Sequence, residues 1–184
     1  MSSLIKQKTI RKEVSFEGTA VHSGLKSKVK LLPAESNNGI VFVRKDKNRK
    51  NIIKASWSNV SNTTLCTTIS NEFGVTVSTI EHLMSAISAL QIDNLKIEVS
   101  GPEIPILDGS SKIYFEKISD VGVVSQEKNK QFIKILKKVS VKNGVSRASL
   151  SPSKNNFNIS YKLNYDHPLI KKENYSIDIN ENNY

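Results

Sequence analysis

The 184-residue sequence has 27 Lys and Arg against 17 Asp and Glu, a net charge of +10, with 38% hydrophobic and 24% charged residues. These are globular proportions, which exclude wholesale disorder, and the length suffices for a substantial core. The single cysteine, Cys66, excludes an intramolecular disulfide framework and fits a reducing compartment. We find no signal sequence and no stretch approaching the roughly 18 apolar residues of a membrane span, so we expect a cytoplasmic protein without integral membrane association.

The excess positive charge is spread along the whole chain. Its densest run, residues 44–51, falls in an expected loop and contains no aromatic residue. Nucleic-acid-binding surfaces combine clustered positive charge with recognisable motifs, and single-strand binders add aromatic stacking. A solvated surface explains this charge at least as well, and we do not expect nucleic-acid binding.

The first half of the chain reads as strands separated by turns. Alternating or β-branched patterns predict strands at residues 8–20, 29–33, 40–43, 63–69 and 95–99. Asn37–Gly39 is a turn signal. The two prolines of Pro102–Pro105 predict a rigid, extended segment, because each fixes its own φ and restricts its predecessor.

A helix is predicted over residues 77–90. Apolar residues at Ile80, Leu83, Met84 and Ile87 follow helical spacing, and a serine and a threonine at positions 78 and 79 are placed to cap its start. No Lys or Arg occurs from residue 73 to residue 95, which indicates that both faces of this helix are covered. A second helix is expected through residues 113–117, ending near Gly122.

Glu81 and His82 lie off the apolar stripe of the first helix, among small side chains. One interpretation is a satisfied helix histidine beside a surface glutamate, because so short a pair occurs by chance in most proteins. The other is a functional pair, in which neutral His82 ligates a metal and Glu81 accepts a proton from metal-bound water. Such a site needs about three protein ligands. Neither His22, in a turn-like segment, nor His167, in an extended one, is spaced to complete it.

Two further residues allow a structural or a functional reading. Cys66 could be a soft metal ligand, although a lone cysteine among Thr and Leu is more often a small buried hydrophobe. Asp108 is placed to cap the second helix, and it could alternatively accept a hydrogen bond from a metal-bound imidazole.

The domain organisation suggests a duplication that stops early. Residues 1–124 form a first domain, the polar run 125–130 reads as a linker, and residues 131–184 echo the beginning of the chain. Weak matches in common order pair Lys12–Gly18 with Lys137–Gly144, Leu31–Pro33 with Leu150–Pro152, and Asn37–Asn38 with Asn155–Asn156. The second copy has no counterpart of residues 63–121, so the sequence looks truncated, and we expect its strands to leave apolar faces uncovered.

Several segments together resemble one enzyme family, the UDP-3-O-acyl-N-acetylglucosamine deacetylases. These zinc amidases of Gram-negative bacteria catalyse the committed step of lipid A biosynthesis. The resemblance covers the whole chain, including Asp166–Pro168, and it is most specific in the Pro-Glu-Ile-Pro-Ile-Leu-Asp-Gly-Ser segment. The segments that carry it are Gly18–Gly24, Thr63–Thr67, Ser78–Leu83, Ile92–Asn94 and Pro102–Ser110.

The resemblance implies an α+β fold, in which each of two similar domains is a two-layer sandwich of sheet and helices. It also implies Zn²⁺ as the cofactor and a UDP-linked acylated glucosamine as the substrate, from which acetate is removed to leave a free amine. Glu81 matches the general base and His82 a zinc ligand. Leu65 and Cys66 match positions that line the active site, and Asp108 matches an acid of the motif.

The sequence departs from the family in its second half. The remaining zinc ligands of the family, a His and an Asp in a His-Lys-x-x-Asp helix motif, have no counterpart here. We therefore expect this chain to be inactive alone and to need a complementing C-terminal fragment. The alternative is a non-catalytic remnant whose basic surface binds RNA or anionic lipid.

Overall fold

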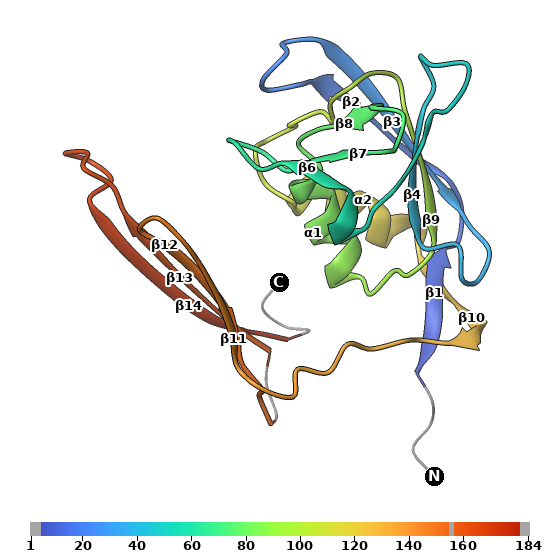
Figure 1. The fold of residues 1–184 in the computed structure, drawn as a ribbon. Helices are drawn as coiled ribbons and strands as arrows, with labels where there is room; N and C mark the ends of the chain where they lie inside the picture. The colour runs from blue at the N-terminus through green and yellow to red at the C-terminus, as the bar shows by residue number, and fades with distance from the viewer. Residues whose placement is uncertain (1–4, 155–156, 181–184) are drawn as a thin grey trace. The chain divides into compact units, whose positions relative to one another are not determined.

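The computed structural model describes residues 5–154 and 157–180, and the chain divides into two compact units, residues 1–130 and 131–184. The centre of the first unit is a five-stranded sheet (Figure 1). Two of its neighbouring strands, Ile40–Arg44 and Leu95–Val99, are parallel, and the other neighbouring strands are antiparallel. In spatial order the strands are β2 (Val14–Thr19), β3 (Lys26–Pro33), β9 (Leu95–Val99), β4 (Ile40–Arg44) and β5 (Ile52–Lys54).

Alternation along the strands gives this sheet one dry and one wet face. In β9, Leu95, Ile97 and Val99 are buried and Lys96 is exposed, as the period of two of a strand requires. The wet face carries ion pairs between neighbouring strands, such as Lys28 with Glu17 at 3.1 Å.

Two helices, α1 (Glu81–Ala89) and α2 (Lys112–Val121), pack beside each other and contribute to the same hydrophobic core as the dry face (Figure 1). The side chains that each helix buries are three or four positions apart and so lie on one face of the helix. They are Leu83, Ala86 and Ile87 in α1 and Tyr114 and Ile118 in α2. The expected α+β class, a layer of helices on a sheet, is confirmed for this unit. Neither helix is long and apolar enough to cross a membrane, and the described residues contain no other α-helix.

Smaller elements surround this sandwich. A short 3₁₀-helix, Trp57–Asn59, leads into a three-stranded sheet of β6 (Val60–Asn62), β7 (Thr68–Ser70) and β8 (Thr76–Val77). β1 (Lys6–Ile10) pairs antiparallel with β10 (Val123–Asn129).

Strand β10 occupies most of the segment that the sequence suggested as a linker over residues 125–130. One polar side chain of this segment is bonded within the first unit: Gln126 Nε2 donates to the carbonyl of Ala34 at 2.9 Å, and its Oε1 accepts from Asn94 Nδ2 at 2.8 Å. The division between the compact units falls after Lys130.

Several local expectations were wrong. The strand predicted over residues 8–20 is interrupted at residues 11–13 and forms two strands, β1 and β2. The strand predicted over residues 63–69 forms only from Thr68, because Leu65 has a φ of 63°, in the left-handed region that interrupts a strand. Neither Ser78 nor Thr79 caps α1, since Ile80 occupies the cap position and no side chain caps the helix. The second face of α1 is not covered, because Ser85 and Ser88 are exposed.

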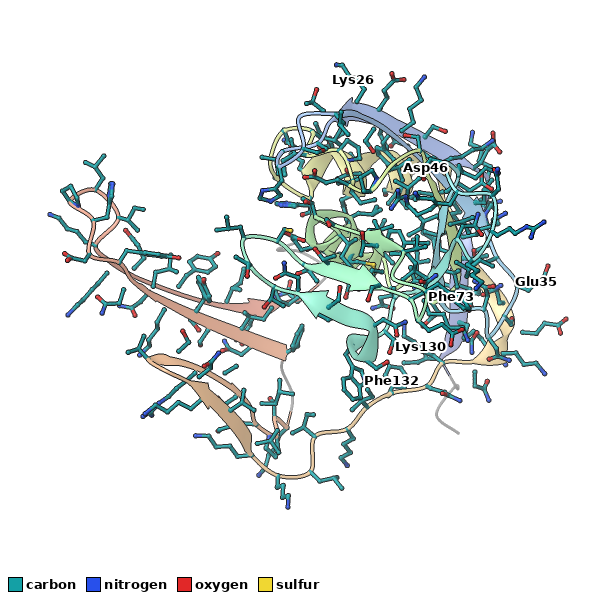
Figure 2. All side chains as sticks on the ribbon, turned by 45° about the horizontal axis from the view of Figure 1, so that its top comes forward. Lys26, Glu35, Asp46, Phe73, Lys130 and Phe132 are labelled. Carbon is teal, nitrogen blue, oxygen red and sulfur yellow. The ribbon has the colours of Figure 1, made fainter. Side chains whose placement is uncertain are left out.

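The second unit consists of two antiparallel hairpins, β11 (Val139–Asn143) with β12 (Ser146–Leu150), and β13 (Phe157–Asn164) with β14 (Lys172–Ile179). In the part of this unit that the structure describes, the side chains stand away from the strands without a packed interior (Figure 2). Apolar strand faces are uncovered, as expected, with exposed Val141, Leu150, Phe157, Tyr161 and Tyr175. Asn155–Asn156, part of the proposed repeat, lies outside the described residues, and the homology of the two units remains a prediction.

Candidate functional site

Glu81 and His82 are the first two residues of α1, and both are half-buried. Oε2 of Glu81 accepts a hydrogen bond of 3.0 Å from the backbone N–H of Thr67. The N–H of Ile80 in turn donates to the carbonyl of Thr67 at 3.4 Å. A carboxylate in the first helical turn also interacts favourably with the helix dipole. The loop before β7 and the start of α1 therefore hold the Glu81 side chain between them.

The same contact brings Leu65 and Cys66 to the start of α1, because they immediately precede Thr67. Leu65 is 86% exposed, although its side chain is large and apolar. Cys66 is half-buried, with Sγ 3.7 Å from Oγ1 of Thr68. The loop that bonds to Glu81 through Thr67 thus carries an apolar side chain and a weakly polar one at the surface.

The residues just before α1 are fixed from the other side by the proline-rich segment. The N–H of Ser78 donates to the carbonyl of Pro102 at 2.9 Å, and the N–H of Ile104 donates back to the carbonyl of Ser78 at 3.1 Å. Thr79, which is buried, has a φ of 59°. That conformation is unusual for a β-branched residue, and it sets the direction in which α1 begins.

Glu103 is the residue at this site that sequence reasoning missed. Its side chain is buried, with the residue 4% exposed, and its carboxylate accepts from the backbone N–H groups of His22 and Ser23, both at 2.9 Å, and from Oγ1 of Thr79 at 3.0 Å. Burial alone would raise the pKa of Glu103, but these hydrogen bonds together outweigh it and lower the pKa. The signal available in the sequence was a lone acid between two prolines in an otherwise apolar stretch.

Asp108 lies in the exposed turn before α2. Its carboxylate accepts from the backbone N–H of Ser110 at 3.0 Å and from the hydroxyl of the same residue. The backbone hydrogen bond from Ser110 is the main cause that lowers the pKa of Asp108. Asp108 therefore stabilises its own turn, and the expectation that it caps α2 was wrong, because Ser111 occupies the cap position and no side chain caps the helix.

The other two histidines lie outside helices and strands, His22 in a turn-like loop as expected and His167 in a turn where the sequence predicted an extended segment. His22 is exposed in the loop after β2, with its backbone bound to Glu103. His167 is exposed in the turn between β13 and β14, where Nδ1 accepts from the N–H of Leu169 at 3.2 Å. Residues 5–154 and 157–180 contain no group of three or more His, Cys, Asp or Glu placed to hold a metal ion.

The chemistry of the pair nevertheless fits part of a zinc site. An imidazole is a common zinc ligand, and catalytic zinc sites use about three protein ligands beside an open position. His82 can supply one of these, and the adjacent Glu81 offers a fixed carboxylate beside it. Among the described residues, this pair could therefore form one part of such a centre and does not complete it.

Comparison with known proteins places this site in a family context. The family model described as UDP-3-O-acyl N-acetylglycosamine deacetylase (LpxC) matches residues 7–184. Three similar proteins carry the name UDP-3-O-acyl-N-acetylglucosamine deacetylase. That of Syntrophus aciditrophicus is 41% identical over 178 residues, covering 97% of this chain and 56% of its own. That of Haemophilus ducreyi is 38% identical, covering 98% and 60%, and that of Myxococcus xanthus is 40% identical, covering 97% and 56%. The chain spans little more than half the length of these relatives.

Proposed function

The chain belongs to the UDP-3-O-acyl N-acetylglycosamine deacetylase family, and from this we propose that it supplies the general base and one zinc ligand of a deacetylase. The reaction is hydrolysis of the N-acetyl amide of UDP-3-O-acyl-N-acetylglucosamine to the free amine and acetate. In lipid A biosynthesis this is the committed step. The proposal rests on a single observation, the fixed Glu81 carboxylate beside His82 at the start of α1.

Glu81 is suited to the role of general base. A general base must hold one oxygen within about 2.6–3.2 Å of the proton that it removes. The bond from the N–H of Thr67 to Oε2, at 3.0 Å, restrains the carboxylate, so that Oε1 can face a water molecule in a constant direction. Glu81 would take the proton from the attacking water, and the family resemblance places the histidine that protonates the departing amine in the portion of the relatives that this chain does not span.

His82 is proposed as the zinc ligand of this chain. A bound zinc ion would polarise the amide carbonyl and lower the pKa of a coordinated water to about 7. The half-buried imidazole next to the general base ties the two functions to one helical turn. Asp108, ionised in its turn, is proposed as an acceptor that orients a zinc-bound imidazole.

Leu65 and Cys66 are proposed to contact the substrate. Their loop is bonded to the start of α1 through Thr67, so a substrate that reaches Glu81 would pass them. The exposed Leu65 side chain suits an acyl group, because burying it against a lipid chain removes apolar surface from water. The net charge of +10 would attract a UDP-linked anion.

This chain alone is proposed to be inactive, because the described residues supply one imidazole where about three ligands are needed. The family resemblance places a His and an Asp ligand in the portion of the relatives that this chain does not span. The test is to measure zinc content and acetate release for the 184-residue chain, first alone and then mixed with the remaining portion of the Syntrophus aciditrophicus relative.

We expect neither stoichiometric zinc nor acetate from the chain alone, and both after mixing. Stoichiometric zinc with turnover by the chain alone would overturn the shared site. In the mixture, Glu81→Gln should lower kcat by about 100-fold or more, the usual contribution of a general base. Glu116→Gln, an exposed change on α2, is the matched control. A mixture in which Glu81→Gln retains full activity would reject Glu81 as the base.

One observation favours a second candidate, a basic surface that binds RNA or anionic lipid. The fold places an aromatic ring beside the basic loop, with Lys50 Nζ 4.1 Å from the ring centroid of Phe73 (labelled in Figure 2). Both line a surface cavity of about 500 Å³ together with Lys54. Binding of single-stranded RNA or of phosphatidylserine vesicles that weakens steeply with salt, and is lost in Lys50→Glu, would support this candidate. No retention of either probe at low salt would reject it.

A further inference from the structure

Glu103 carries a buried negative charge that the proposed chemistry does not use. Burying an ionised carboxylate is costly unless it is hydrogen-bonded. Glu103 meets this condition with three donors: Oε1 accepts from the N–H of His22 and the hydroxyl of Thr79, and Oε2 accepts from the N–H of Ser23. Its own carbonyl accepts from Oγ of Ser27 at 2.6 Å. All these partners lie far from Glu103 in the sequence.

The three donors belong to two separate segments. His22 and Ser23 lie in a tight loop, closed by the hydrogen bond from the N–H of Ala20 to the carbonyl of Leu25 at 2.9 Å. Thr79 is the left-handed residue two positions before Glu81. A single carboxylate therefore joins the loop that carries an exposed histidine to the turn from which α1 starts.

We propose that Glu103 is a positioning residue of the deacetylase site, whose buried carboxylate holds the His22 loop and the Thr79 turn together and so fixes the direction in which Glu81 and His82 leave the turn. This proposal rests on the function proposed above. Glu103 does not touch the substrate in this scheme. It acts through the backbone of Thr79, whose conformation decides where the first turn of α1 points.

The donor arrangement requires a carboxylate. The two backbone N–H groups bond to different oxygens of Glu103. A glutamine would satisfy one and turn its own NH₂ donors toward the other, leaving a partly buried N–H without an acceptor. The hydroxyl of Thr79 can be tested by two substitutions. Serine keeps the hydroxyl that bonds to Glu103, and valine keeps the shape of the side chain without the hydroxyl.

The first experiment measures amide hydrogen exchange in the 184-residue chain by NMR. In Glu103→Gln we expect the amides of His22 and Ser23 to exchange at least 10-fold faster, while the amides of Leu31 and Ile97 in the central sheet are unchanged. Glu116→Gln is the control and should alter neither group. Equal acceleration throughout the sheet would mean general destabilisation and would overturn the proposal, as would unchanged exchange at His22 and Ser23.

The second experiment measures kinetics in the mixture that restores acetate release, with rates expressed per bound zinc. Glu103→Gln and Thr79→Val should each lower kcat by about 10-fold with little change in KM, and Thr79→Ser should retain the activity. An unchanged kcat in Glu103→Gln would overturn the positioning role. Absence of acetate release by the unmodified mixture would instead reject the proposed function, and the exchange experiment would still decide whether Glu103 holds the two segments.

Discussion

Asp46 binds the buried guanidinium of Arg44 at two points, with hydrogen bonds of 2.8 Å to Nε and 2.7 Å to Nη2. The remaining nitrogen, Nη1, donates to the carbonyl of Thr76. One arginine of the basic loop is therefore an internal tie between β4 and β8 and contributes little to the positive surface. Strand β8 leads directly into the turn before α1, so the bond from Arg44 to Thr76 holds the strand that precedes the candidate site.

Removing this guanidinium should destabilise the first unit. In Arg44→Met we expect a loss of about 2 kcal/mol in the free energy of unfolding, because the charged hydrogen bonds disappear and the carbonyl of Thr76 loses a buried donor. Lys28→Met is the control, since its ion pair with Glu17 is exposed on both sides and should be worth less than about 1 kcal/mol. Urea unfolding followed by circular dichroism measures both. Equal midpoints for the two variants would contradict the prediction.

Gly18 is required by the close approach of the proline-rich segment. A β-carbon on Gly18 would lie 3.1 Å from Cβ of Pro105 and 3.2 Å from Cδ2 of Leu107. Gly18→Ala should therefore cost about 1–2 kcal/mol, as overpacking does in a well-packed region. Gly101→Ala is the matched control, because a β-carbon there meets nothing within 4 Å. Thermal unfolding of both variants tests the difference, and a stable Gly18→Ala protein would show that the segment can move away.

Acid should weaken the contribution of Glu103. Its pKa is lowered in the folded protein from an ordinary value of 4.5, so its ionised form stabilises the fold fully above about pH 4.5 and this stabilisation is lost as the pH falls through the folded-state pKa. The difference in Tm between the unmodified chain and Glu103→Gln should therefore be largest near neutral pH and shrink below pH 4.5. Glu116→Gln should show no such convergence. A constant difference from pH 7 to pH 3 would contradict the argument.

Trypsin should separate the two compact units before it digests the first. Residues 130–138 form neither helix nor strand, and Lys134, Lys137 and Lys138 are exposed. Exposed backbone without regular hydrogen bonds is the preferred site of cleavage. Mass spectrometry of a brief digest should show a fragment that ends within residues 134–138. The lysine-rich loop at residues 44–51 is the internal comparison, and first cleavage there would contradict the prediction.

Much of the first unit could be predicted from the sequence because its signals are local. The alternation in Leu95–Val99 and the helical spacing of Leu83 and Ile87 each depend on a few neighbouring residues. The candidate pair Glu81 and His82 was found in the same way, since a gap in the distribution of positive charge surrounds it. Its family role came from the resemblance, and the structure adds the bond from Thr67.

What could not be predicted depends on contacts between distant segments. The left-handed backbone of Leu65 and Thr79 is held by the surrounding structure and is contrary to local preference. Glu103 meets donors about 24 and 80 residues away, which no local pattern records. Asn94 is similar: its amide bonds to Gln7 and Gln126 at 2.8 Å each, so the Ile-Asp-Asn segment that helped to mark the family has a structural role here.

The segment Pro102–Ser110 gave the most specific family resemblance, and its contacts show that it has a structural role. It bonds to the end of β2 through Ile106 and Thr19 at 3.0 Å, to the residues before α1 through Ser78, and to α2 through the hydroxyl of Tyr114 and the carbonyl of Pro105. These bonds assemble the framework of the first unit. On the function proposed above, a change at Glu81 alone would impair hydrolysis while every residue of this segment stayed in place. The segment is therefore a marker of ancestry, and activity has to be judged from the turn that it supports.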